Sequence, residues 1–197
     1  MRVGLGTGST VAHLLPAIAA RGHRHLRCVA TSPATERAAL ALGMTVENLE
    51  DLGELDMAID GADQIDPAGW LIKGGGGAHT REKIVASAAA RFVVIASAEK
   101  AVATLTPAVP LELLSFGVGH TLGMLAPARL REVPASPDGG LIADYLGPVG
   151  DPRELAARLC ATPGVVDHGL FAPELVSLIR IAGDDGVESR PGPKAPA

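Results

Sequence analysis

The chain has 197 residues, which suits one medium domain or a main domain with a small second lobe, and 47% are hydrophobic and only 3% aromatic, so aliphatic side chains must fill the core. Its formal net charge of -5 argues against a nucleic-acid partner, which favours a basic surface, although a local positive pocket could still bind an anion. Cys28 and Cys160 lie too far apart for a disulfide scaffold, and no apolar run is long enough for a membrane helix, so we expect a cytoplasmic protein.

Short apolar strands alternate with helices over the first half of the chain. The expected strands lie at residues 3–5, 26–30, 44–46, 55–59 and 92–96. The expected helices lie at residues 9–20, 33–42 and 77–91. Because the strands are continuous apolar runs, the alternation indicates a parallel sheet covered on both faces, as in an α/β, Rossmann-like domain.

After Pro107 the pattern changes to that of a small α+β lobe, with expected strands at 109–114, 141–145 and 165–166 and helices at 119–130 and 151–159. A last apolar strand at 175–181 could rejoin the main sheet, and the chain from Gly183 onward is expected to fray. The expected parts are a Rossmann-like main domain at 1–105 plus 172–190, a ferredoxin-like α+β lobe at 106–171 and a disordered tail at 191–197.

A glycine-rich turn, residues 4–10, joins the first expected strand to the first expected helix. Its glycines let the backbone approach a ligand, the helix start adds N–H donors, and Thr7, Ser9 and Thr10 add hydroxyl groups, so a phosphate would fit. The spacing matches neither the dinucleotide fingerprint nor a Walker A loop. Taken alone, the turn favours anion binding only slightly over a plain strand–helix turn whose hydroxyls cap the helix.

Two carboxylates, Asp60 and Asp63, follow an expected buried strand, with Gly61 and Ala62 between them. Open α/β sheets bind ligands at the carboxyl ends of their strands, so both side chains could bond sugar hydroxyls or carry a proton. Taken alone, this pair is better interpreted as an acidic turn followed by a helix cap.

Four consecutive glycines, residues 74–77, follow Lys73 and precede an expected helix that carries Glu82. Such a run is costly in chain entropy and a structural turn rarely needs it, so it indicates a backbone that lies against a ligand. Glu82 shares a helix face with Ala78 and Ala86, whose small side chains would leave room for a substrate. The alternative is an exposed glutamate paired with a neighbouring basic residue.

Two further residues with reactive side chains lie in this helix and after the strand that follows it. His79 has no second histidine or cysteine nearby at metal-site spacing, so we expect a surface or capping histidine and no metal ion. Lys100 follows the expected strand at 92–96 and would point toward the same edge of the sheet, although a solvated lysine is the simpler interpretation.

Together and in order, these motifs resemble type A ribose-5-phosphate isomerase over nearly the whole chain. The matching stretches are GLGTGST at 4–10, TS at 31–32 with Thr35, DMAIDGAD at 56–63, LIKGGGGAHTREKIVASAA at 71–89, Lys100, PLEL at 110–113, the strand ending at Asp144, and TPGVVDHGLF at 162–171. The resemblance implies that the chain interconverts ribose 5-phosphate and ribulose 5-phosphate through an enediolate, without cofactor or metal. It also implies a homodimer or homotetramer whose partner is a small sugar phosphate, not nucleic acid or a membrane.

The resemblance assigns roles to four side chains. Glu82 matches the base that moves a proton between C2 and C1. Asp60 and Asp63 match carboxylates at the sugar, and Lys73 matches the cation that stabilises charge on the substrate oxygens. The other implied substrate contacts are Thr7, Gly8, Ser9, Thr10, Thr31, Ser32, Gly61, Ala62, Gly74, Gly75, Gly76 and Lys100. The chemistry agrees, because a proton removed next to a carbonyl leaves negative charge that fixed donors stabilise, while a distant phosphate grip orients the reacting carbons.

The chain departs from the family pattern in three places. It starts in or beside the first strand, where members usually carry a helix whose basic residue helps the phosphate site. Gln64 stands where the family often has Glu, and the turn at 138–140 is short and lacks the common Asn.

Two alternatives to an active isomerase follow. A non-catalytic sugar-phosphate sensor has no need to retain all four reactive side chains, and a regulator would carry a basic DNA-reading helix. An inactive paralogue with a shortened start is the other interpretation.

Overall fold

The computed structural model describes residues 1–22 and 25–194 and divides the chain into two compact units. The main unit comprises Met1–Ala62, Arg81–Lys100 and Pro173–Ala197, and the small unit comprises Asp63–Thr80 and Ala101–Ala172. The chain therefore crosses between them four times, and each unit is described by itself below.

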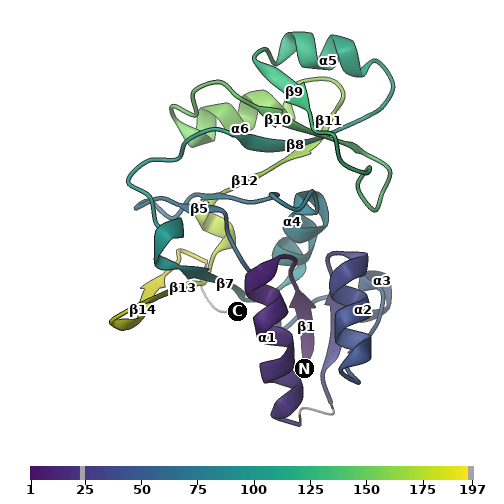
Figure 1. Cartoon of the computed structure of the whole chain (residues 1–197), viewed down its shortest axis with the longest axis vertical. Helices are drawn as coiled ribbons and strands as arrows, with labels where there is room; N and C mark the ends of the chain where they lie inside the picture. The colour runs from purple at the N-terminus through teal and green to yellow at the C-terminus, as the bar shows by residue number, and fades with distance from the viewer. Residues whose placement is uncertain (23–24, 195–197) are drawn as a thin grey trace. The chain divides into compact units, whose positions relative to one another are not determined.

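A seven-stranded sheet forms the centre of the main unit (Figure 1). In spatial order its strands are β14 (Gly186–Pro191), β13 (Leu178–Gly183), β7 (Phe92–Ser97), β4 (Met57–Asp60), β1 (Arg2–Leu5), β2 (Arg27–Ala30) and β3 (Thr45–Val46). All neighbours pair parallel except β14, which pairs antiparallel with β13. The order β3-β2-β1-β4-β7-β13 is the Rossmann order, and the direction of winding reverses between β1 and β4, where open α/β sheets bind their ligands.

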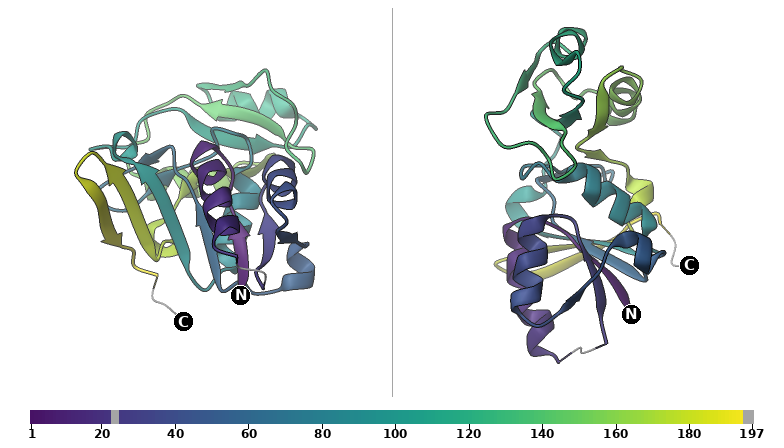
Figure 2. Two further views of the ribbon diagram at one scale, coloured as in Figure 1. Left: turned by 60° about the horizontal axis from the view of Figure 1, so that its bottom comes forward. Right: turned by 90° about the vertical axis from the view of Figure 1, so that its right-hand side faces the viewer.

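Helices cover both faces of this sheet, as the continuous apolar strands predicted (Figure 2). They are α1 (Ser9–Ala20), α2 (Pro33–Ala41), the short α3 (Leu49–Leu52) and α4 (His79–Ala88). In β1 the alternating residues Val3 and Leu5 pack with α1 and α2 in one buried cluster. Gly4 faces the opposite side, where a Cβ atom would lie 2.3 Å from a methyl carbon of Val85 in α4. Gly4 thus lets α4 pack directly on the backbone of β1.

The larger sheet of the small unit has a ferredoxin-like topology, as expected. Its order is β11-β8-β10-β9 with antiparallel neighbours, and two helices complete a β-α-β-β-α-β unit. These elements are β8 (Val109–Leu113), α5 (Val118–Met124), β9 (Ala128–Leu130), β10 (Leu141–Tyr145), α6 (Pro152–Cys160) and β11 (Val165–His168). A second, three-stranded antiparallel sheet consists of β5 (Gln64–Ile65), β6 (Leu71–Ile72) and β12 (Leu170–Phe171).

Two features of the small unit differ from the sequence expectation. Residues 119–130 do not form one helix, because α5 ends at Met124 and Pro127, which disfavours a helix at the residue before it, leads into β9. Residues 63–80 belong to the small unit rather than to the main domain, because β5 and β6 pair with β12 and not with the parallel sheet.

The C-terminal segment is ordered where we expected fraying. The strand expected at 175–181 is found at Leu178–Gly183, and a hairpin turn with φ of 122° at Gly186 leads into β14. Beyond β14, the Lys194 ammonium donates to the carbonyls of Ala86 and Ala89 at the C-terminus of α4, at 3.2 and 2.6 Å. The predicted disordered tail at 191–197 is therefore wrong for residues 191–194, and residues 195–197 lie outside the described residues.

Candidate active site

The predicted site residues are divided between the two units. The main unit holds Thr7, Gly8, Ser9, Thr10, Thr31, Ser32, Asp60, Gly61, Ala62, Glu82 and Lys100. The small unit holds Asp63, Lys73, Gly74, Gly75 and Gly76.

Asp60 connects the loop after β1 with the loop after β4, at the point where the winding of the main sheet reverses. Its side chain is 3% exposed, and its Oδ1 accepts hydrogen bonds from the backbone N–H groups of Thr7 (3.1 Å) and Gly61 (2.7 Å). A Cβ atom at Gly6 would lie 1.9 Å from that oxygen, so only glycine leaves room for the carboxylate. The loop after β1 and the loop after β4 are therefore fixed to each other by one buried carboxylate.

Three hydroxyl residues after β2 hold the glycine-rich loop from the other side. Thr31 and Thr7 share a hydrogen bond between their Oγ1 atoms at 2.7 Å, and the Thr35 hydroxyl donates to the Gly6 carbonyl at 2.9 Å. Ser32 caps α2, because its Oγ accepts from the Thr35 N–H at 3.2 Å. All three hydroxyl residues are buried, so they stabilise the loop, and the substrate contacts expected of Thr31 and Ser32 stay predictions.

The N-terminus of α1 opens onto a cavity of about 440 Å³ in the main unit. Its N-cap residue Gly8 has φ of 115° and supplies no capping side chain, so the first N–H groups of the helix have no side-chain acceptor there. The cavity is lined by Ser9, Thr10, His13, Ile95, Ala96, Ser97, Arg180, Ala182 and Val187. Hydroxyl groups, an imidazole and a guanidinium thus share one hollow, which suits an anion.

The face of the sheet next to α1 explains why these side chains meet. Arg180 of β13 pairs in parallel register with Ile95 of β7, so both lie on the same side, and the yellow hairpin β13–β14 extends the sheet past α1 in Figure 2. The guanidinium of Arg180 donates to the Ser189 hydroxyl. Lys100, on the 3-10 turn Ala98–Lys100 after β7, is half-buried and is not among the residues that line the cavity.

Glu82 is 5% exposed, so the alternative of a solvated surface glutamate is wrong. Val85, one turn later on α4, packs against Gly4 of β1. Because α4 precedes the parallel strand β7, the helix runs antiparallel to the strands and its first turns lie toward their carboxyl ends. Glu82 is therefore buried in the first turns of α4, near the carboxyl ends of the parallel strands.

In the small unit the glycine run is tied to Asp63. The N–H of Gly75 donates to Asp63 Oδ2 at 2.8 Å. Gly74 has φ of 104°, and a Cβ atom there would lie 2.7 Å from Nδ1 of His79, while Gly77 has φ of 71°. These glycines are required by contacts and backbone angles inside the unit, which weakens the argument that the run by itself indicates a ligand.

Lys73, at the start of the glycine run, is a buried cation. Its side chain is 3% exposed, its N–H donates to the Gly169 carbonyl at 2.8 Å, and its ammonium lies 5.4 Å from the ring centroid of Phe171. An ammonium beside an aromatic face is attracted to the ring more strongly where water is excluded.

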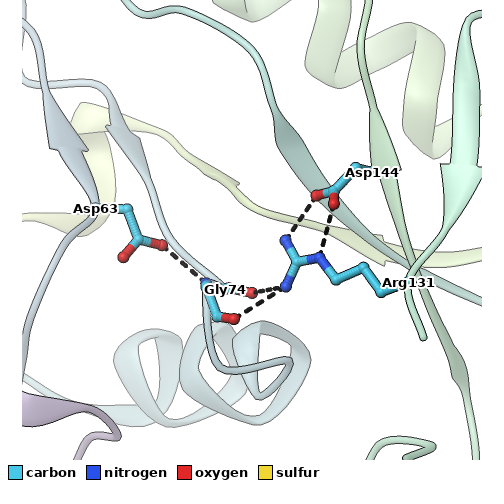
Figure 3. Close-up of polar contacts among 5 residues, drawn as sticks. Asp63, Gly74, Arg131 and Asp144 are labelled. Atoms are coloured by element: carbon cyan, nitrogen blue, oxygen red, sulfur yellow. Dashed lines mark hydrogen bonds and ion pairs between the residues drawn. The ribbon is translucent and has the colours of Figure 1, made fainter. Parts of the chain in front are cut away.

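Arg131 and Asp144 lie beside the glycine run of the small unit and were not predicted as site residues (Figure 3). The guanidinium of Arg131, just after β9, binds both carboxylate oxygens of Asp144 at 2.8 and 2.6 Å. Its Nη1 also donates to the carbonyls of Gly74 and Gly75, each at 3.0 Å. The hydrogen bonds that Arg131 donates to Asp144, with a smaller contribution from the charge of Asp63, raise the pKa of Arg131 above its ordinary value. No local signal marks Arg131, because its partners lie far away in the sequence.

His79 was expected at the surface or as a cap, and the surface position is wrong. The residue is fully buried at the start of α4, where the missing side chain of Gly74 makes room for the imidazole ring. Among residues 1–22 and 25–194, no three His, Cys, Asp or Glu side chains gather as a metal ion would require.

Comparisons with known proteins agree on one family. The profile of the family described as "Ribose 5-phosphate isomerase A (phosphoriboisomerase A)" matches residues 27–186. Ribose-5-phosphate isomerase A of Roseiflexus sp. (strain RS-1) is 44% identical over 211 residues, which cover 99% of this chain and 90% of the relative. Ribose 5-phosphate isomerase from Plasmodium falciparum superposes with a TM-score of 0.91 at 33% identity, covering 98% of this chain and 91% of that one. A D-ribose-5-phosphate isomerase in complex with phospho-erythronic acid gives a TM-score of 0.91 at 29% identity, with 97% and 90% covered.

Proposed function

Since the chain belongs to the ribose-5-phosphate isomerase A family, whose members interconvert ribose 5-phosphate and ribulose 5-phosphate, we propose that Glu82 moves the proton of this reaction between C2 and C1. The chain is an aldose–ketose isomerase of the pentose phosphate pathway, not the sensor left open by its sequence. The observation that supports Glu82 is its burial on α4, toward the carboxyl edge of the main sheet. A carboxylate shielded from water is a stronger base than a solvated one.

The phosphate group binds at the N-terminus of α1. The first-turn N–H groups and the hydroxyls of Ser9 and Thr10 are the donors, and Arg180 of the same cavity supplies positive charge. An anion held there fixes one end of the substrate, so its binding energy orients the carbons that react.

The other reactive side chains contact the sugar oxygens while the reaction passes through an enediolate. Asp60 and Asp63 are oriented by backbone N–H groups and accept hydrogen bonds from the sugar hydroxyls, including during ring opening. Lys73 stabilises the negative charge that develops on oxygen when the proton leaves carbon. No step of this mechanism uses a metal ion or an organic cofactor.

Glu82→Gln is the direct test of the proton transfer. We expect kcat to fall about 10²- to 10⁴-fold while ribose 5-phosphate still binds, because the amide keeps the shape and loses the base. Exchange of the substrate C2 proton with D₂O, followed by NMR, should disappear together with turnover. The matched control is Glu54→Gln at an exposed position, which should behave like the parent.

Three outcomes of this experiment are distinguishable. Parental turnover in Glu82→Gln would remove this residue from the role of base. Continued C2 exchange without ketose formation would move Glu82 to a later step. A parent protein that binds the sugar phosphate but never isomerises it would contradict the activity of this chain.

The active form is a homodimer or homotetramer in the cytoplasm. Phe116 is 92% exposed in the small unit, and Leu114 beside it is also exposed, which is unfavourable in an isolated monomer. Cys28 and Cys160 are both thiols, which is typical of a reducing compartment. Light scattering should give at least twice the chain mass, and the double change Leu114→Ser with Phe116→Ser should lower it; an unchanged mass would place the interface elsewhere.

A further inference from the structure

The loop at 74–77 needs an external support, because it contains only glycines. Glycine loses more backbone entropy on ordering than any other residue, so such a loop does not hold one conformation by itself. The loop also carries the Gly75 N–H that donates to Asp63 at 2.8 Å. Whatever fixes the loop therefore also fixes the orientation of this carboxylate.

The guanidinium of Arg131 supplies that support (Figure 3). One nitrogen, Nη1, donates to the carbonyls of Gly74 and Gly75, each at 3.0 Å. The other two nitrogens bind Asp144 in a fork, which sets the plane of the guanidinium. The backbone is held as well, since the Arg131 N–H donates to the Ile142 carbonyl of β10 at 2.9 Å. Arg131 is thus anchored on β10 and reaches the loop from a rigid sheet.

The planarity of the peptide bond connects these contacts to Asp63. The Gly74 carbonyl and the Gly75 N–H belong to the same trans peptide, so they point in opposite directions. When Arg131 binds the carbonyl on one side, the N–H on the other side must face Asp63. A cation on the carbonyl also polarises the peptide and strengthens its N–H as a donor.

From this geometry we infer that Arg131 is a positioning residue of the isomerase, which aims the Gly74–Gly75 peptide so that its N–H holds the Asp63 carboxylate toward the sugar. The inference rests on the proposed role of Asp63. The charge relation agrees, because the carboxylate of Asp63 contributes to the raised pKa of Arg131.

The first test observes the peptide itself and does not depend on activity. In protein labelled with ¹⁵N-glycine, the Gly75 amide proton should resonate downfield and be protected from exchange. Arg131→Met should shift this signal upfield and lower its protection, and Arg131→Lys should do so partly, because an ammonium cannot bind two carbonyls and Asp144 in one plane. Arg129→Met, an exposed arginine on β9, is the matched control and should leave the signal unchanged.

The second test measures the effect on the reaction. We expect Arg131→Lys to lower kcat about 10- to 100-fold with little change in KM. The phosphate-binding contacts are unchanged, whereas the Asp63 carboxylate is misplaced relative to the sugar. In an Asp63→Asn background the same change should have little further effect.

The outcomes separate this inference from the proposed function. An unchanged Gly75 signal in both Arg131 variants, or an equal loss of kcat with and without Asp63, overturns the positioning role. Parental activity of Asp63→Asn, with the Gly75 signal still dependent on Arg131, would instead refute the proposed role of Asp63. If Arg131→Met fails to fold, as judged by circular dichroism, Arg131→Lys and its Gly75 signal decide the question.

Discussion

Replacing Gly6 by alanine tests how closely the loop after β1 is fitted to the carboxylate of Asp60. The added Cβ would lie 1.9 Å from Oδ1 and 2.0 Å from Cγ of Asp60, far inside van der Waals contact. Asp60 has little room to withdraw, because it is buried and its Oδ1 is held by the N–H groups of Thr7 and Gly61. Either the carboxylate or the loop must move.

The cost can be estimated from the contacts that this movement breaks. Overpacking a filled site costs about 1–3 kcal/mol, and losing a hydrogen bond to a charged group costs about 1.5–3 kcal/mol. A combined loss of about 3–5 kcal/mol should lower the melting temperature by roughly 10 °C for a chain of this size. Turnover should fall as well, since the same movement displaces Asp60 from the sugar.

Thermal unfolding of Gly6→Ala, together with its rate on ribose 5-phosphate, checks this estimate. Gly61→Ala is the nearby control for stability, because its Cβ would have no neighbour closer than 3.8 Å. Gly119→Ala on α5 is the remote control, because no atom would lie within 4 Å of its Cβ, and it should gain up to about 1 kcal/mol from lower chain entropy. A Gly6→Ala protein with the parental melting temperature and rate would show that Asp60 moves freely and refute the reasoning.

Four further predictions concern other parts of the main and small units. Asp151→Ala should lower the free energy of unfolding in urea by about 1 kcal/mol, because its carboxylate caps α6 through two N–H groups at 2.8 and 3.3 Å; no change would mean that water replaces the cap at no cost. Burial raises the pKa of the Cys28 thiol from 9.0 to about 11, so the folded state holds this proton at a higher pH than the unfolded state does. The contribution of the thiol to the free energy of unfolding should therefore be full below pH 9 and be lost between pH 9 and 11. Cys28→Ala should flatten that decline. At pH 8 iodoacetamide should label the exposed Cys160 and spare Cys28, and equal labelling would contradict the burial of Cys28. Arg180→Gln should raise KM about tenfold, or about 1.4 kcal/mol, with kcat nearly unchanged, because the lost charge lies at the phosphate end; a fall in kcat alone would place Arg180 outside that end.

The sequence predicted the central architecture because its signals are repeated and local. Continuous apolar strands separated by helices indicated a parallel sheet covered on both faces, and the sheet has the Rossmann order with helices on both sides. The strands at 92–97 and 141–145 were placed within one residue. The helices expected at 33–42 and 151–159 are found at Pro33–Ala41 and Pro152–Cys160.

The failures occurred where one specific contact, rather than the average hydropathy of a segment, decides the local structure. β14 was expected to fray because the chain from Gly183 onward is rich in Pro, Gly and charged residues, yet a full register with β13 orders it. A surface position was one of the two expected for His79, although the space beside Gly74 buries the imidazole. Hydropathy describes the average environment of a residue type and cannot register one neighbour that lacks a side chain.

The residues at the site divide in the same way. The sequence by itself determined which loops carry the reactive groups, because glycines and carboxylates at strand ends are local patterns: residues 4–10, the pair Asp60 and Asp63, and the block from Lys73 to Glu82. Only the tertiary structure decided what holds them, namely that Asp60 fills the space left by Gly6 and that Arg131 binds the glycine loop. The physical reason is that a hydrogen bond acts over about 3 Å, whereas its two partners here are more than fifty residues apart in the chain and meet only after the strands have found their order.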